Sequence, residues 1–317
     1  MFTGIARLAR SGSWVEQKRR VTYHALPTRR LINQCGVPRM PFEWTVNPYR
    51  GCEFGCRYCY ARSTHEFMEF HAPEDFETRI FAKEFTAEHA AAELRRLPRD
   101  QTIALGTATD PYQPAERRFR RTRRFLEAFA GMRGRTLFIT TKGDLVRRDV
   151  DILQACAREN AIAVNLTITT LDARLARALE PFAPRPDLRL AAVEALARAG
   201  IHTGVFASPV LPGLNDGLRP LEAVARAAAA CGARTFGAQM LFLKPAAARV
   251  FLPWLAREFP ALASAYRAQF ARSAYVRGAL AERLAGTVRA VRARYGLGAR
   301  RPSAPACGQP TPFPAPK

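Results

Sequence analysis

Three cysteines with metal-ligand spacing lie close together in the segment GCEFGCRYCYAR (51–62). Cys52, Cys56 and Cys59 follow the pattern CxxxCxxC, and thiols spaced this closely commonly bind metal. A structural zinc site takes four ligands, so zinc would need a fourth, such as His65. A [4Fe–4S] cluster also normally takes four cysteines, and three leave one iron open to a substrate or a second cofactor. Iron–sulfur, zinc and simple packing of three cysteines are the alternatives that this spacing allows.

The elements that must position these cysteines are alternating strands and helices. Apolar, β-branched stretches predict six strands, at 42–47, 101–108, 135–141, 161–169, 201–208 and 234–242. Apolar residues three or four apart predict intervening helices, at about 84–97, 116–131, 145–158, 187–199 and 220–231. This alternation indicates an α/β fold of parallel βα units, either a partial barrel or an open doubly wound sheet. No GxGxxG motif follows the first strand, which argues against a dinucleotide-binding sheet.

Polar residues end nearly every predicted strand. In βα barrels the chemistry lies at the carboxyl ends of the strands, where a packed core alone does not require polar groups. The polar strand-end residues are Asn47, Thr107, Thr109, Asp110, Thr140, Thr141, Lys142, Thr167, Thr169, Ser208 and Gln239. We therefore expect one site at this edge, beside the cysteines.

The cysteine spacing, with Tyr58 directly before the third cysteine, resembles the signature of the radical S-adenosylmethionine enzymes. The likeness covers roughly residues 42–245 and implies a partial (β/α)6 barrel. It also implies a [4Fe–4S] cluster on Cys52, Cys56 and Cys59, whose open iron chelates S-adenosylmethionine. Reduction then yields methionine and a 5′-deoxyadenosyl radical that abstracts hydrogen from a substrate. An electron donor such as flavodoxin or ferredoxin is the partner that this chemistry implies.

The resemblance also assigns roles to the strand-end residues. Lys142, one of only five lysines, ends the third strand on the same face as Thr140 and is expected to hold the cofactor carboxylate. We expect Lys142 and Tyr60 to be catalytic, and Tyr58 to pack against the cluster. The other expected cofactor contacts are Thr107, Thr109, Asp110, Asn165, Thr167, Thr169 and Ser208.

Within the superfamily, the chain is most similar to the spore photoproduct lyase-like branch, often labelled DNA repair photolyases. The similarity rests on four elements: NPYRGCEFGCRYCYAR (47–62), TATD (107–110), ITTK (139–142) and NLTITTLD (165–172). Tyr58 and Tyr60 resemble tyrosines that line the lyase active site. In the lyase, a cysteine of the second-strand element returns hydrogen to the product radical, and this chain has Thr107 there. A threonine O–H is a poor hydrogen-atom donor, so the resemblance does not carry over spore photoproduct repair itself. The chain resembles more closely uncharacterised bacterial proteins of this branch that carry NPYRGC, GTxTDPYQPxE and TTLD elements, which this chain has as NPYRGC, GTATDPYQPAE and TTLD.

Positive charge is concentrated in three parts of the chain. The net charge is +22, from 49 basic and 27 acidic residues. Residues 1–50 carry +7, residues 117–124 (RRFRRTRR) carry +6 and residues 267–301 carry +8. Such clustering is typical of a protein that binds a polyanion, and nucleic acid is the partner we expect from it. Solvated faces on an arginine-biased chain are the alternative.

Composition also bounds domains and location. We divide the chain into a basic N-terminal arm (1–41), a core barrel (42–250), a C-terminal helical extension (251–299) and a disordered proline-rich tail (300–317). No apolar run is long enough for a membrane span, and the N-terminus lacks the apolar core of a signal peptide. Seven cysteines do not form a secreted disulfide framework in a chain of this length. We expect a cytoplasmic protein without a membrane partner.

Three functions are consistent with these observations. The first is a radical S-adenosylmethionine enzyme that abstracts hydrogen from a nucleic-acid base or lesion. The second is the same chemistry on a small molecule or a protein. The third is a non-enzymatic, zinc-stabilised nucleic-acid-binding protein. The substrate, the hydrogen donor and the oligomeric state are not indicated by the sequence.

Overall fold

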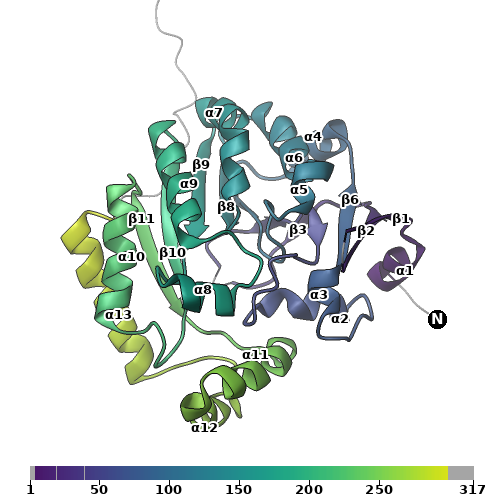
Figure 1. The fold of residues 1–317 in the computed structure, drawn as a ribbon. Coiled ribbons are helices and arrows are strands. Elements are labelled where there is room, and N and C mark those ends of the chain that lie inside the picture. The colour runs from purple at the N-terminus through teal and green to yellow at the C-terminus, as the bar shows by residue number, and fades with distance from the viewer. Residues whose placement is uncertain (1–3, 19, 39, 299–317) are drawn as a thin grey trace, which may run out of the picture.

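The computed structural model describes residues 4–18, 20–38 and 40–298 (Figure 1). Its main sheet has the strand order β11-β10-β9-β8-β7-β4-β3. All neighbours in this sheet are parallel except β3, which is antiparallel to β4. The strands are β3 Ile32–Gln34, β4 Trp44–Val46, β7 Thr102–Leu105, β8 Thr136–Thr141, β9 Ala161–Thr167, β10 His202–Val210 and β11 Thr235–Met240. The six predicted parallel strands are therefore confirmed, in an α/β architecture with a mostly parallel sheet.

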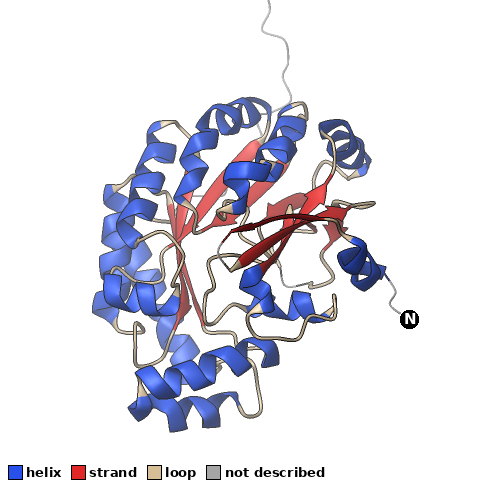
Figure 2. Cartoon of the chain, turned by 45° about the vertical axis from the view of Figure 1, so that its right-hand side comes forward, coloured by secondary structure: helices blue, strands red, loops and turns tan. Residues whose placement is uncertain are grey.

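Helices join the parallel strands and cover the outside of the main sheet (Figures 1 and 2). They are α4 Ala87–Arg96, α5 Ala115–Phe119, α6 Arg121–Ala130, α7 Val150–Glu159, α8 Ala173–Leu179, α9 Pro186–Arg198 and α10 Leu218–Ala230. A 3₁₀ helix, η2 Asp144–Asp149, precedes α7. The five predicted helices are all present, whereas α8 was not predicted from the sequence.

The helix predicted over 116–131 is broken in two. Arg120 has a φ of 50°, in the left-handed region, and separates α5 from α6. The Glu116 carboxylate accepts hydrogen bonds from the backbone N–H groups of Thr122 (2.9 Å) and Arg123 (3.2 Å). It thus satisfies donors that the first turn of α6 leaves unpaired, which compensates for the break.

Alternation along the strands separates an apolar face from a polar one. In β8, Leu137 and Ile139 are buried in the largest apolar cluster, where α6 contributes Phe125. Thr140 and Lys142 are two residues apart and half-buried, so they share the opposite face. The sequence prediction that these two side chains lie on one face is consistent with this alternation.

A second sheet lies beside the main one, on the right in Figure 2, with the order β1-β2-β6-β5. Its strands are β1 Trp14–Lys18, β2 Val21–Pro27, β6 Arg79–Glu84 and β5 Tyr49–Arg50. The segment expected to be an N-terminal arm thus supplies α1 Gly4–Ser11 and strands to both sheets. Pro27, which suggested an irregular arm, instead ends β2. Tyr23 and Leu26 of β2 are buried, which fixes this strand against β6.

Three further helices follow the βα units, and the first begins at Pro245, before the predicted start of the C-terminal extension at 251. They are α11 Pro245–Glu258, α12 Pro260–Phe270 and α13 Ala279–Tyr295. An aromatic cluster of Phe251, Trp254 and Tyr266 joins α11 to α12. The predicted tail at 300–317 lies outside the described residues. No helix of the described chain combines the length and the apolar character needed to cross a bilayer.

Candidate active site

The cysteine loop begins at a glycine that no other residue can replace without strain. Gly51 has a φ of 82°, and a Cβ there would lie 2.7 Å from the carbonyl oxygen of Arg79 and 2.9 Å from that of Phe76. The next residue, Cys52, donates its backbone N–H to the Phe76 carbonyl at 2.9 Å. The start of the loop is therefore held tightly against α3 Asp75–Thr78 and the beginning of β6.

Replacing Gly51 with alanine is expected to lower the unfolding free energy by about 2 kcal/mol or more, because the left-handed conformation alone costs roughly 1–2 kcal/mol and two backbone oxygens obstruct the methyl group. Thermal melting of the variant tests this. Gly286→Ala is the matched control: this glycine lies inside α13, and the nearest atom to its Cβ is 3.9 Å away. There the same change is expected to raise stability by about 0.5–1 kcal/mol. Equal effects of the two substitutions would contradict the prediction.

The loop carries three free thiols whose surroundings favour the protonated form. Cys52 and Cys56 are buried and Cys59 is half-buried. Burial raises the pKa of Cys52 well above its usual value, and the negative charges of Asp110, Cys56 and Cys59 raise it further. Burial likewise raises the pKa of Cys56 to about 12, although Lys142 opposes the shift. Burial also raises the pKa of Cys59. Each thiolate thus needs a cationic partner.

These thiols are a suitable donor set for an iron–sulfur cluster. They lie in one short loop, where the Cys59 N–H donates to the Cys56 carbonyl at 3.2 Å, and a bound iron cluster would stabilise all three as thiolates. Among the described residues, no group of three or more His, Cys, Asp or Glu side chains is already arranged to hold a single metal ion. A cluster that brings its own sulfides needs only these three thiols from the protein, whereas a structural zinc site needs a fourth ligand.

His65, the candidate fourth zinc ligand, has a different environment. Its ring packs against Phe76, with the ring centres 5.3 Å apart, and its Nε2 lies 3.0 Å from the Arg79 carbonyl oxygen. The side chain is 2% exposed, and burial lowers its pKa to about 4. His65 is thus a neutral residue of the aromatic core.

Replacing His65 with phenylalanine is expected to flatten the pH dependence of stability on the acid side. The pKa of His65 is about 4 in the folded chain and 6.5 ordinarily, so the unfolded chain takes up the proton first as the pH falls. The neutral, buried His65 therefore contributes its full stabilisation above the unfolded pKa, and this contribution is lost as the pH falls toward the folded pKa. At about pH 5 the free energy of unfolding is lower by about 2 kcal/mol. Urea unfolding at about pH 7 and about pH 5 measures it.

The exposed His71 provides the control, because His71→Phe is expected to leave the wild-type acid sensitivity in place. If His65→Phe and the wild type lose the same free energy between the two pH values, the prediction is wrong.

Asn47, at the end of β4, joins the first two parallel strands. Its Oδ1 accepts hydrogen bonds from the backbone N–H groups of Thr107 (2.9 Å) and Ala108 (2.7 Å). Its Nδ2 donates to the Thr107 hydroxyl at 3.1 Å. The Tyr60 hydroxyl donates to the Thr107 carbonyl. Thr107 and Tyr60, both predicted site residues, are therefore brought together at this strand end.

The loop after β7 braces the cysteine loop. The Thr109 hydroxyl donates to the Gly51 carbonyl at 2.6 Å, and the Gln113 side chain donates to the same oxygen at 3.0 Å. The Gln113 side-chain oxygen also accepts a hydrogen bond from the backbone N–H of Glu53 at 3.0 Å. The Glu53 carboxylate in turn accepts one from the backbone N–H of Ala115 at 2.7 Å. Gln113 is fully buried. These bonds connect the TATDPYQPAE segment directly to the backbone of the cysteine loop.

Asp110 positions the backbone at Lys142. Its carboxylate accepts hydrogen bonds from the Lys142 N–H (2.7 Å), the Thr141 hydroxyl (2.5 Å) and the Tyr112 N–H (2.9 Å). Burial raises the pKa of Asp110, although the three hydrogen bonds oppose the shift. Three internal donors thus occupy a carboxylate that the sequence suggested for cofactor binding.

A buried polar network lies beneath the cysteines. The Tyr58 hydroxyl donates to Glu180, which also accepts the Thr169 hydroxyl at 2.7 Å. Glu180 forms an ion pair with Arg189 at 2.5 Å. The Lys142 ammonium lies 5.6 Å from the centre of the Tyr58 ring. Burial lowers the pKa of Lys142, but negative charge at Cys56 and Glu180 raises it above the ordinary value, so this lysine is charged.

The polar face of β9 continues this site. Asn165 is half-buried on the same face as Thr167 and faces Gly204 of β10, where a Cβ would collide with its Oδ1. Thr167 is 6% exposed, and Ser208 contributes its carbonyl to the Thr169 hydroxyl at 3.1 Å. Glycine at 204 therefore leaves room for a polar side chain between two strands.

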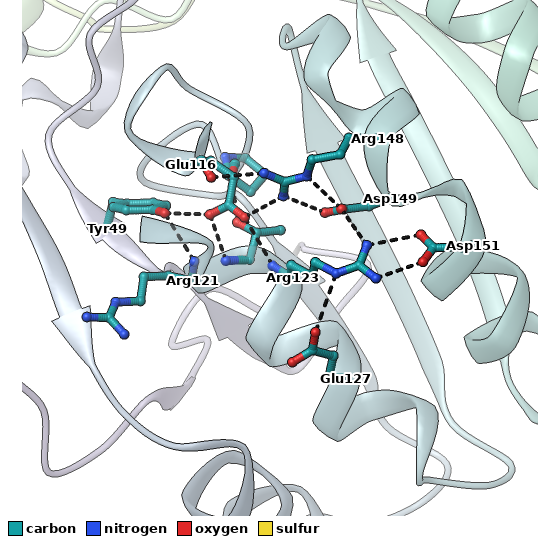
Figure 3. A network of polar contacts seen from close by, with 10 residues as sticks. Tyr49, Glu116, Arg121, Arg123, Glu127, Arg148, Asp149 and Asp151 are labelled. Atoms are coloured by element: carbon teal, nitrogen blue, oxygen red, sulfur yellow. Dashed lines mark hydrogen bonds and ion pairs between the residues drawn. The ribbon is translucent and has the colours of Figure 1, made fainter. Parts of the chain in front are cut away.

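Part of the RRFRRTRR cluster is engaged in internal contacts (Figure 3). Glu116 accepts the Tyr49 hydroxyl and an Arg148 N–H at 2.8 Å. Arg123 pairs with Asp149 (3.0 Å) and Asp151 (2.7 Å). Outside the view, Arg124 donates to a backbone carbonyl. At least two of the six arginines in 117–124 thus have structural partners, which weakens this cluster as evidence for a polyanion.

The structure thus divides the predicted residues by their contacts. Tyr58, Thr169 and Lys142 share one network, and Tyr60 and Thr107 share another. Thr109 and Asp110 bond to the protein backbone. The buried residues that sequence reasoning missed are Glu53, Gln113, Glu116, Glu180 and Arg189. The only signal for Gln113 and Glu116 was their place in the PYQPAE element.

Comparison with known proteins supplies the wider context. A sequence model described as the radical SAM superfamily matches residues 46–225. An uncharacterized protein of Mycobacterium tuberculosis (Rv2578c) is 37% identical over 288 residues, which are 90% of this chain and 84% of that protein. An uncharacterized protein of Methanocaldococcus jannaschii is 29% identical over 60% of this chain and 68% of its own length. A mutant of spore photoproduct lyase with bound AdoMet and dinucleoside spore photoproduct has a similar fold, with a TM-score of 0.65 and 16% identity over 93% of this chain and 85% of that one.

Proposed function

Because this chain belongs to the radical SAM superfamily, we propose that it abstracts a hydrogen atom from a base or a base lesion of nucleic acid. Members of the superfamily use a [4Fe–4S] cluster and S-adenosylmethionine, and these are the cofactors of the chain. When bound, these cofactors would supply a one-electron reductive cleavage of the sulfonium of S-adenosylmethionine, giving methionine and a 5′-deoxyadenosyl radical that would take hydrogen from the substrate. The protein positions the reactants and excludes water.

One observation supports nucleic acid as the proposed substrate class. The three-cysteine loop lies at the carboxyl edge of the parallel strands, in a fold like that of spore photoproduct lyase, whose structure holds a dinucleoside photoproduct. The net charge of +22 supports the same class, since it favours a polyanionic substrate. A small molecule or a protein is the competing substrate class.

The proposed reaction differs from spore photoproduct repair. Thr107 stands where the lyase-like pattern has its hydrogen-donating cysteine, and its hydroxyl is hydrogen-bonded to Asn47. An O–H bond is a poorer hydrogen-atom source than a thiol. We therefore propose a radical transformation, lyase-like or of another type, that does not use a thiol at this position.

The residues of the site take the following proposed roles. Cys52, Cys56 and Cys59 hold the cluster. Tyr58 packs beside it, and Tyr60 lines the substrate side. The hydroxyl and amide groups proposed to contact the cofactor are those of Thr107, Asn165, Thr167, Thr169 and Ser208. Thr109 and Asp110, predicted as cofactor contacts, act instead as positioning residues in this proposal, because their polar atoms bond to Gly51 and Lys142.

Lys142 is proposed to hold the carboxylate of S-adenosylmethionine. Its substitution by methionine is expected to weaken binding of this cofactor about 10- to 100-fold, the value of one charge-assisted hydrogen bond. Equilibrium dialysis of the cluster-loaded protein with radiolabelled S-adenosylmethionine measures the change. Lys142→Arg keeps the charge and is expected to lose less. Unchanged affinity in Lys142→Met would remove this residue from the cofactor site.

The decisive test of the function is anaerobic turnover. Reconstitution with iron and sulfide is expected to give a brown protein that, with dithionite, converts S-adenosylmethionine to 5′-deoxyadenosine. With base-deuterated DNA or RNA, deuterium is expected in the 5′-deoxyadenosine. Zinc binding without a cluster or cofactor cleavage would refute the enzyme. If the protein cleaves S-adenosylmethionine but shows neither label transfer nor salt-dependent binding of nucleic acid, a small-molecule or protein substrate is favoured.

The free thiols are consistent with the reducing cytoplasm, which we propose as the location. The physiological electron donor is proposed to be a flavodoxin or a ferredoxin. Replacing dithionite with a reduced flavodoxin tests this partner directly.

A further inference from the structure

Three aromatic side chains form a continuous row beside the cysteine loop. The rings of Tyr60 and Phe242 are 6.2 Å apart between centres, and those of Phe242 and Tyr275 are stacked at 4.5 Å with a 29° angle. Tyr60 directly follows Cys59, Phe242 follows β11, and Tyr275 lies between α12 and α13. We call Tyr60, Phe242 and Tyr275 the aromatic row.

The fold holds this row in place through the backbone. Phe242 and Tyr275 form an antiparallel bridge, and Leu243 donates its N–H to the Ala274 carbonyl at 2.9 Å. The Tyr60 hydroxyl is bonded to Thr107 at the end of β7. The row therefore runs from the strand ends at the site to the C-terminal helical segment.

The row is accessible to solvent. Tyr60 is 47% exposed and Tyr275 is 50% exposed, whereas aromatic rings used for core packing, such as Phe251, are buried. The backbone bridge holds Tyr275 against Phe242 and leaves half of Tyr275 exposed to solvent. Stacked rings presented to solvent provide a surface for further planar groups.

Positive charge flanks both ends of the Phe242–Tyr275 pair. The Lys244 ammonium lies 5.7 Å from the centre of the Phe242 ring, and the Arg277 guanidinium lies 5.7 Å from that of Tyr275. Among the described residues, neither cation has a hydrogen-bonded or ion-paired partner, unlike Arg123 or Arg249. These two charges are therefore available to a ligand.

We propose that the aromatic row, with Lys244 and Arg277, binds an unpaired stretch of nucleic acid, and that its rings stack on successive bases leading to the site. This inference rests on the proposed nucleic-acid substrate and specifies its form as unpaired. Exposed aromatics interleaved with cations are how single strands are bound without a sequence code, since every base has a face to stack. Bases paired inside a duplex do not offer that face, and an acidic peptide would use the cations but not the stacked rings.

The test is binding of a fluorescein-labelled oligothymidylate of about 12 nucleotides, a length within the footprint of single-strand binders, to the cluster-loaded protein, followed by fluorescence anisotropy. Tyr275→Ala is expected to weaken binding about 10-fold, and Tyr275→Phe is expected to restore it because the ring remains. Lys244→Ala and Arg277→Ala are each expected to reduce the slope of log K against log salt by about 0.7. An oligouridylate of equal length distinguishes DNA from RNA.

Two controls isolate the row. Phe67→Ala removes a ring that is 71% exposed, and Arg198→Ala removes an exposed cation at the end of α9. Both are expected to bind as the wild type does. Melting temperatures check that every variant is folded. If Tyr275→Ala does not fold, Lys244→Ala and Arg277→Ala still test the proposal.

The outcomes separate this inference from the proposed function. If the wild type binds the oligonucleotide but the row and charge variants bind it as well as the controls do, the proposed role of the aromatic row is wrong. The proposed nucleic-acid substrate is then unaffected. If the wild type prefers a blunt duplex, the unpaired form is wrong. If it binds no nucleic acid, the proposed substrate class fails together with the row, whereas cleavage of S-adenosylmethionine persists.

Discussion

Replacing Cys56 with alanine is expected to abolish both the iron–sulfur absorbance and the reductive cleavage of S-adenosylmethionine. The loop offers three thiols, and a cluster that already leaves one iron open cannot lose another protein ligand and keep its cofactor site. The measurement is the visible spectrum and the iron content after anaerobic reconstitution, followed by assay of 5′-deoxyadenosine.

Cys231 provides the matched control for this loss. It is a free, half-buried thiol at the end of α10, on the far side of the βα units from the strand ends. Cys231→Ala is expected to keep the iron content and the cleavage rate of the wild type. A Cys56→Ala protein that still cleaves S-adenosylmethionine would show that the cluster is held elsewhere.

Converting Glu180 to glutamine is expected to lower the unfolding free energy by about 3–5 kcal/mol, the cost of breaking a buried ion pair by removing one partner. Burial alone would raise the pKa of Glu180, but Arg189 and Lys142 lower it below the ordinary value, so the carboxylate is charged. Both side chains of the Glu180–Arg189 pair are almost completely buried. The substitution leaves the Arg189 charge buried without its counterion, and urea unfolding measures the result.

The exposed ion pair of Glu194 with Arg198 joins the same two side-chain types in solvent and serves as the control. Glu194→Gln is expected to change stability by less than about 0.5 kcal/mol, because water screens an exposed pair. Equal losses in the two variants would contradict a structural role of the buried pair. A loss confined to Glu180→Gln, with weaker cofactor binding as well, would show that the network also positions Lys142.

The charge distribution takes on a different meaning in three dimensions. The sequence concentrates +6 in residues 117–124, yet Arg123 pairs with carboxylates and Arg124 with a carbonyl. By contrast, Lys244 and Arg277, the latter within the basic segment 267–301, lie beside exposed rings. Local charge density in the sequence therefore does not show which cations are free, because it does not register the counterions that the fold supplies.

The sequence by itself determined the family resemblance and the succession of strands and helices along the chain. The spacing of the three cysteines within one loop predicts them as cluster ligands, and the six strands were predicted from short apolar, β-branched stretches. Both signals are local, so neither requires knowledge of the path of the chain. The break at Arg120 was not visible, because it depends on Glu116 turning back to cap the next helix.

Only the tertiary structure decided which partners the polar strand-end residues contact. Thr109, Asp110, Thr167 and Thr169 look alike in sequence, but the first two bond to Gly51 and Lys142, whereas Thr169 shares Glu180 with Tyr58. Glu180 lies 122 residues from Tyr58 along the chain, and the aromatic row joins positions 60, 242 and 275. Such contacts depend on the packing of distant elements, and a side chain's chemistry alone does not select its partner.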